Sequence, residues 1–204
     1  MTREGTGPTG PLANGSEPAA RHGTRRLLRT VVLVGMMGSG KSAIGRALSQ
    51  KLGVPFIDSD AEIEAAANAT IAEIFARDGE TFFRRREAEV IARLLRAPPM
   101  VLSTGGGAFM SERNRKAISE HGVSLWLNAS LPTLWERVRH KDTRPLLQQA
   151  DPKGTLAALY QDRLPTYALA DLSVFAEPGY SIEDTTNLAV KTLLTRPDVL
   201  EPTS

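Results

Sequence analysis

The sequence predicts a three-layer α/β domain in which helices cover both faces of a five-stranded parallel sheet. Five short apolar runs alternate with segments of helical periodicity, a pattern typical of parallel βαβ units. The runs are mostly apolar throughout, as expected for strands buried on both faces. They lie near residues 31–34, 54–58, 100–103, 123–127 and 172–175. Ligands of such sheets bind at the carboxyl ends of the strands, so the residues after each strand carry the functional prediction.

The first strand leads into a glycine-rich turn that fits the P-loop pattern G-x-x-x-x-G-K-[ST] at every fixed position. Residues 35–42 read GMMGSGKS, and a helical segment follows from Ala43. Glycines let consecutive backbone N–H groups point at one anion, and the helix dipole adds to the attraction. Lys41 would reach the terminal phosphates, and the Ser42 hydroxyl would be a ligand of Mg²⁺. The predicted nucleotide-binding residues here are Gly38, Ser39, Gly40, Lys41, Ser42 and Ala43.

The composition limits the classes of protein to which the chain can belong. A chain of 204 residues with 41% hydrophobic content is expected to form one domain with a tail. It contains no Cys, which excludes disulfides and thiolate metal sites. No apolar run approaches the roughly 18 residues of a membrane span, and no secretory signal is recognisable, so the cytoplasm is the expected location. Residues 1–24 are rich in Gly, Pro, Thr and Ser and are expected to be disordered, leaving a domain over residues 25–198.

The net charge of +2 does not indicate a nucleic-acid partner. Residues 1–29 hold five arginines and two glutamates, a net charge of +3, so residues 30–204 carry a net charge of −1. The folded part therefore has no overall basic surface of the kind that nucleic-acid binding requires.

The second strand stops at Asp58-Ser59-Asp60, and helical segments follow over residues 60–67, 70–77 and 80–96. One of the two aspartates could hold water around Mg²⁺ while the other addresses a substrate hydroxyl. Asp60 could also cap the helix that follows, and the two roles are not exclusive.

Residues 84–86 are three successive arginines. On a helix their side chains point in different directions, so at most one or two can face a common cleft. The alternative is that all three lie on a solvent-exposed face of the helix.

The third strand opens into the triple glycine Gly105-Gly106-Gly107. Further helices are expected over residues 112–120, 131–139, 155–169 and 182–194. The polar segment 140–154 separates two of them and has the length of a lid.

Together these motifs closely resemble shikimate kinase. The shared motifs are the P-loop, D-x-D at 58–60, F-R-x-x-E at 83–87, G-G-G at 105–107, R-P-L at 144–146 and R-x-P at 163–165. They occur in one order across roughly residues 30–176, which is far more specific than any single motif. The resemblance implies a nucleoside monophosphate kinase-like P-loop NTPase fold, with ATP as cosubstrate and Mg²⁺ as metal. It also implies transfer of the γ-phosphoryl group to the 3-hydroxyl of shikimate, a step of chorismate and aromatic amino acid biosynthesis.

The resemblance implies a role for each matching position. Asp60 binds the shikimate hydroxyl and helps to remove its proton, and Arg84 and Arg163 grip the carboxylate. The backbone of Gly105, Gly106 and Gly107 contacts the same substrate. Arg144 closes with the lid on the ATP phosphates and, with Lys41 and Asp60, completes the catalytic set. The metal residues are Ser42 and, through water, Asp58.

Two segments depart from expectation. Residues 137–142 contain several cations, and the sequence does not indicate whether any of them contacts adenine. Residues 176–179 lack the Asp-Thr or similar pair that often holds adenine in this family. Two alternatives stay open: a gluconate kinase of the same fold, and a nucleotide-dependent switch or binding module without catalysis. The chain is expected to be a monomer.

Overall fold

The structure is a computed structural model that describes residues 25–139, 150–177 and 179–202. Its strands are β1 (Thr30–Val34), β2 (Phe56–Asp58), β3 (Val101–Ser103), β4 (Gly122–Ala129) and β5 (Leu172–Ala176). Its helices are α1 (Lys41–Leu52), α2 (Ser59–Ala67), α3 (Ile71–Leu95), the 3-10 turn η1 (Ala108–Met110), α4 (Glu112–His121), α5 (Leu131–Val138), α6 (Pro152–Tyr167) and α7 (Ile182–Leu193). The expected tail, residues 1–24, and most of the expected lid lie outside the described residues.

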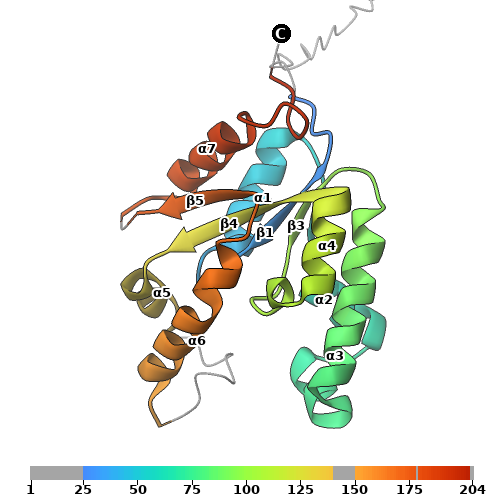
Figure 1. Cartoon of the computed structure of the whole chain (residues 1–204), viewed down its shortest axis with the longest axis vertical. Helices are drawn as coiled ribbons and strands as arrows, with labels where there is room; N and C mark the ends of the chain where they lie inside the picture. Colours follow the sequence, from blue (N-terminus) through green and yellow to red (C-terminus); the bar gives the residue numbers. More distant parts are fainter. Residues whose placement is uncertain (1–24, 140–149, 178, 203–204) are drawn as a thin grey trace, which may run out of the picture.

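The five strands form one parallel sheet in the order β2-β3-β1-β4-β5 (Figure 1). The central strand β1 pairs with β3 on one side and with β4 on the other, so that Val31 lies opposite both Val101 and Val123. The predicted five-stranded parallel sheet is therefore confirmed. Because all strands run the same way, the segments after β1, β2 and β3 emerge at one edge.

The residues of β1 alternate between two apolar cores. Val31 and Leu33 pack with residues of α1 and α7, whereas Val32 and Val34 pack with residues of α3, α4, α5 and α6. Successive side chains of a strand point to opposite faces, so a continuous apolar run buries both faces of the sheet. The three-layer arrangement follows directly from this run.

The helices α2 and α3 carry a small third core at one end of the molecule. Ile63, Ile74 and Phe83 form it, and the Phe75 and Phe83 rings lie 4.7 Å apart. A capping box between Thr70 and Glu73 begins α3, and Gly79 interrupts it with φ 80°. The predicted helices 70–77 and 80–96 are therefore two segments joined at a kink, and the second segment holds the arginines of residues 84–86.

Two sequence-based boundaries are corrected. Helix α6 begins at Pro152, because Asp151 caps it by accepting a hydrogen bond from the Gly154 amide at 2.9 Å, so residues 152–154 belong to a helix and not to a lid loop. The packed region also extends beyond residue 198, since Leu200 is fully buried and pairs with Leu27.

Among the described residues, no helix is both long and apolar enough to cross a membrane.

Candidate active site

The P-loop forms a cradle between β1 and α1. Gly38 and Gly40 adopt φ values of 81° and 96°, which side chains other than glycine rarely allow. A Cβ atom at Gly38 would also lie 2.6 Å from the Val138 side chain, so the loop packs directly on α5. The Lys41 ammonium donates to the carbonyl oxygens of Gly35 at 2.8 Å and Met36 at 3.0 Å. The loop thus holds a cation beside the amino end of α1, as phosphate binding requires.

Ser42 and Asp58, the two predicted metal residues, lie together. The Ser42 hydroxyl donates to Asp58 Oδ2 at 3.2 Å, while Asp58 Oδ1 accepts from the Asp60 amide at 3.1 Å and caps α2. Asp58 is therefore the N-cap, and the alternative reading of Asp60 as the cap is wrong. No group of three or more His, Cys, Asp or Glu that could hold a metal ion occurs within the described ranges. One hydroxyl and one carboxylate fit Mg²⁺, which keeps several waters and binds substrate phosphates.

The triple glycine leaves room for charged side chains that lie against the turn. A Cβ atom at Gly105 would lie 2.8 Å from Asp60 Oδ1, and one at Gly107 would lie 2.6 Å from a terminal nitrogen of Arg84. Between them, the Gly106 carbonyl accepts a hydrogen bond from Arg163 at 3.4 Å. Three charged side chains from α2, α3 and α6 therefore converge on one turn after β3.

Asp60 lies in the first turn of α2 with its carboxyl group largely buried. Burial raises the pKa of Asp60 to about 6, the neighbouring carboxylates of Asp58, Glu87 and Glu64 also raise it, and Lys41 lowers it. Within the described part of the chain, Asp60 Oδ1 is buried and has no hydrogen-bond partner. An acceptor oxygen of this kind is suited to the hydroxyl of a ligand.

Arg84 is the one of the three successive arginines that faces the glycine turn. Its guanidinium donates to both carboxylate oxygens of Glu87, at 2.9 and 3.1 Å, and Glu87 is 1% exposed. Burial raises the pKa of Glu87, although the charge of Arg84 opposes this. Arg85 and Arg86 instead pair with Glu89 on the surface. Glu87 thus anchors Arg84; the sequence motif contained Glu87 but assigned it no role.

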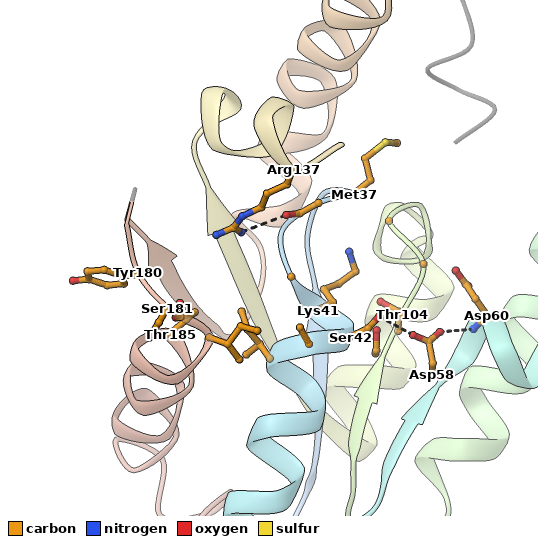
Figure 2. Close-up of a pocket in the computed structure, with 18 residues that line it drawn as sticks. Met37, Lys41, Ser42, Asp58, Asp60, Thr104, Arg137, Tyr180, Ser181 and Thr185 are labelled. Carbon is orange, nitrogen blue, oxygen red and sulfur yellow. Dashed lines mark hydrogen bonds between the residues drawn. The ribbon is translucent and has the colours of Figure 1, made fainter. Parts of the chain in front are cut away.

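A cavity of about 500 Å³ extends from the glycine turn along the P-loop (Figure 2). Asp60 lies at one side of the cavity and Lys41 and Ser42 lie in its middle (Figure 2), and Gly105 and Gly106 also line it. Its far side is formed by residues that the sequence did not assign to the site: Arg137 of α5, and Tyr180, Ser181, Ile182 and Thr185 at the start of α7. The only signals for them were the cations of residues 137–142 and the position of residues 180–185 after the last strand.

The predicted site residues differ in their relation to this cavity. Gly38, Gly40, Ala43 and Asp58 also line it. Ser39, Arg84, Gly107 and Arg163 do not, although the guanidinium groups of Arg84 and Arg163 lie next to the glycine turn. Ser39 is buried within the P-loop. Arg144 lies outside the described residues, so its predicted role in the lid stays a prediction.

Residues 37–193 match the model of the shikimate kinase family. The chain belongs to this family. The shikimate kinase of Ruegeria pomeroyi is 64% identical over 179 residues, which cover 88% of this chain and 92% of the relative. That of Cereibacter sphaeroides is 59% identical over 187 residues, covering 92% and 94%. A solved structure of shikimate kinase from Acinetobacter baumannii in complex with shikimate is 37% identical, has a TM-score of 0.75 and covers 82% of this chain and 92% of that one.

The comparisons also bear on the gluconate kinase alternative. A gluconokinase from Sinorhizobium meliloti is similar with a TM-score of 0.55 but only 21% identity. That likeness extends to the fold alone. The predicted P-loop kinase fold and the resemblance to shikimate kinase are both confirmed.

Proposed function

We propose that this protein transfers the γ-phosphoryl group of ATP to the 3-hydroxyl of shikimate, as its family membership implies. The observation that carries the proposal is the glycine turn, where a buried carboxylate and two guanidinium groups meet beside the P-loop. A hydroxylated carboxylate needs both: an acceptor for its hydroxyl proton and cations for its carboxylate. A nucleotide switch has no need of this acceptor pocket.

On the acceptor side, Asp60 receives the proton of the attacking hydroxyl. Its pKa of about 6 leaves it mostly ionised at pH 7 yet basic enough to polarise that proton. Arg84 and Arg163 bind the shikimate carboxylate, because a planar guanidinium can form two parallel hydrogen bonds to it. The backbone of Gly105, Gly106 and Gly107 comes close to the substrate because no side chain separates them.

On the nucleotide side, the P-loop residues 38–43 bind the phosphates, and Ser42 with Asp58, the latter through water, holds Mg²⁺. The metal would neutralise charge on the phosphate oxygens. Lys41 adds positive charge at the transferred group, and Arg144 does so when the lid covers the site. The adenine base lies in the part of the cavity between Arg137 and the start of α7, where Arg137 donates to the Gly38 carbonyl at 3.4 Å.

Phosphoryl transfer requires mainly positioning and charge stabilisation, and one chain supplies every assigned residue. We therefore propose that the protein acts as a monomer. Closure of the lid would keep water, a competing acceptor, away from the transferred group.

The function is tested by measuring ADP release with shikimate, with gluconate and without an acceptor. We expect ATP turnover when shikimate is the acceptor, and none with gluconate or without an acceptor. Turnover with gluconate but not with shikimate would contradict the proposal and support the gluconate kinase alternative. ADP release that no acceptor increases would instead indicate a nucleotide hydrolase or switch.

The carboxylate clamp is tested by replacing Arg84 or Arg163 with Lys, which keeps the charge and removes the planar donor pair. We expect the KM for shikimate to rise about 10- to 100-fold, because a hydrogen bond to a charged group contributes about 1.5–3 kcal/mol. The KM for ATP should hardly change. Arg86→Lys is the matched control, since Arg86 pairs with Glu89 on the surface. Equal effects on both substrates would indicate phosphate contacts instead of a clamp.

A further inference from the structure

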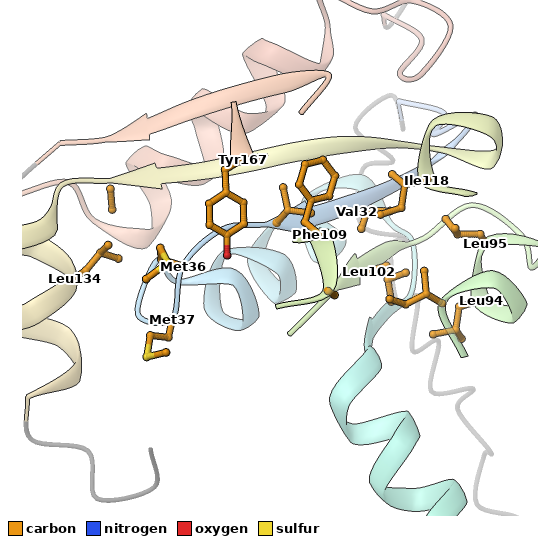
Figure 3. Packing of buried hydrophobic residues seen from close by; sticks show 14 of the residues in the cluster. Val32, Met36, Met37, Leu94, Leu95, Leu102, Phe109, Ile118, Leu134 and Tyr167 are labelled. Atoms are coloured by element: carbon orange, nitrogen blue, oxygen red, sulfur yellow. The ribbon is translucent and has the colours of Figure 1, made fainter. Parts of the chain in front are cut away.

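Tyr167, the last residue of α6, is a buried tyrosine with a polar contact to the active-site turn. Its side chain is 1% exposed, and its hydroxyl donates a hydrogen bond to the Gly106 carbonyl. Its ring lies in the main apolar core (Figure 3). It stacks near Phe109 at 6.4 Å and near Trp126 at 6.1 Å between ring centroids, with interplanar angles of 8° and 16°. The core therefore holds the ring while the hydroxyl extends to the turn.

The Gly106 carbonyl receives two donors from one face of α6. Arg163 and Tyr167 are four residues apart, which places both side chains on the same side of the helix. A carbonyl oxygen has two lone pairs, and these two donors can occupy both. The peptide unit between Gly106 and Gly107 is planar and trans, so fixing the direction of its carbonyl also fixes its N–H on the opposite side.

Three glycines in succession leave this turn with little conformational restraint of its own. Glycine adopts a wider range of backbone angles than any other residue and loses more freedom on folding. The Ala108 amide donates to the Gly105 carbonyl and the Met110 amide donates to the Gly107 carbonyl, both at 3.1 Å, whereas the Gly106 carbonyl between them accepts from the two side chains of α6. Burial raises the pKa of Tyr167 to about 12, so its hydroxyl remains a donor throughout the neutral and moderately alkaline range.

We propose that Tyr167 is a positioning residue for the acceptor substrate. The Tyr167 hydroxyl fixes the Gly106 peptide and keeps the Arg163 side chain in place against the glycine turn. The inference rests on the proposed function, because the turn and Arg163 are assigned to shikimate there. Tyr167 acts through the turn and through Arg163, without contact with the reacting atoms. None of the sequence motifs assigns a role to Tyr167.

Tyr167→Phe tests the proposal because it removes the hydroxyl and keeps the stacked ring. We expect the KM for shikimate to rise roughly 3- to 10-fold, the range that the loss of one ordinary hydrogen bond gives. The KM for ATP should stay within about twofold of the wild-type value. Tyr160→Phe is the matched control: Tyr160 lies two turns earlier on α6, and its hydroxyl makes no hydrogen bond within the described residues.

A double-variant cycle distinguishes positioning from packing. If Tyr167 acts with Arg163 on one peptide, the effects of Tyr167→Phe and Arg163→Lys on the KM for shikimate will not multiply. A lowered melting temperature with an unchanged KM for shikimate, or strictly multiplicative effects, would overturn the proposal and leave Tyr167 as a packing residue. A wild-type protein that does not phosphorylate shikimate would overturn the proposed function itself, and this inference with it.

Discussion

Replacing Lys41 by Met is expected to lower turnover by at least about 10²–10³-fold while the domain stays folded. The ammonium lies in the P-loop, bound to the Gly35 and Met36 carbonyls, where charge develops on the transferred phosphoryl group. Met keeps an unbranched side chain of similar length and a high helix propensity, so α1 should still begin at this position. The measurement is kcat with both substrates saturating, together with circular dichroism of the variant.

Binding of shikimate without nucleotide provides a second measurement for this variant. It should survive, because the acceptor groups of Asp60, Arg84 and Arg163 are unchanged. Lys51→Met is the control: Lys51 lies at the other end of α1, where it bonds the Asn187 side chain on the surface. Near-normal turnover of Lys41→Met would contradict the assignment of residues 35–42 as the catalytic P-loop.

The parts of the site that could be predicted without the family resemblance are those that follow the ends of strands. The P-loop, Asp58 with Asp60, and the triple glycine each follow an apolar run, and parallel strands bring their carboxyl ends to one edge. Their convergence therefore needs no knowledge of side-chain packing. The fold class was predictable for the same reason, since strands buried on both faces have a continuous apolar pattern.

The parts that the sequence did not predict depend on how helices pack against one another. Glu87 anchors Arg84 only because α3 is turned so that Glu87 is buried, and spacing along the chain does not determine that rotation. Tyr167 reaches Gly106 across 61 positions in the sequence. The choice of Asp58 over Asp60 as the cap depends on where β2 stops, and such boundaries shift by a residue or two.

Asp60→Asn is expected to raise the stability of the protein at neutral pH. The folded protein raises the pKa of Asp60 to about 6 from an ordinary value of 3.8, so ionised Asp60 opposes folding. This penalty is fully present above about pH 6 and disappears as the pH falls below 3.8. A shift of about two pKa units corresponds to about 3 kcal/mol at most, and a domain of this size gains about 2–4 °C in Tm per kcal/mol.

The stability prediction is checked by thermal unfolding at pH 7.5 and at about pH 4. We expect the Tm advantage of Asp60→Asn at pH 7.5 to shrink toward pH 4, where Asp60 in the wild-type protein is also uncharged. Since Asp58 and not Asp60 caps α2, the substitution leaves the helix cap intact. Glu62→Gln is the control in the same first turn, because Glu62 forms a surface ion pair with Arg93.

The same variant is expected to lose turnover by about 10²–10⁴-fold, the contribution of a positioned general base. Asn has no carboxylate to take the proton of the acceptor hydroxyl, whereas ATP binding depends on the P-loop and should change little.

In the wild-type protein, kcat/KM for shikimate should fall about tenfold per pH unit below about pH 6, as Asp60 becomes protonated. This fall should be absent from the pH profile of Asp60→Asn. Higher stability joined to lower activity is the signature of a charge that is kept for catalysis at the expense of folding. If Asp60→Asn is more stable but turns over shikimate normally, the carboxylate is not the base. The proton of the hydroxyl must then leave by another route, such as through the phosphoryl oxygens themselves.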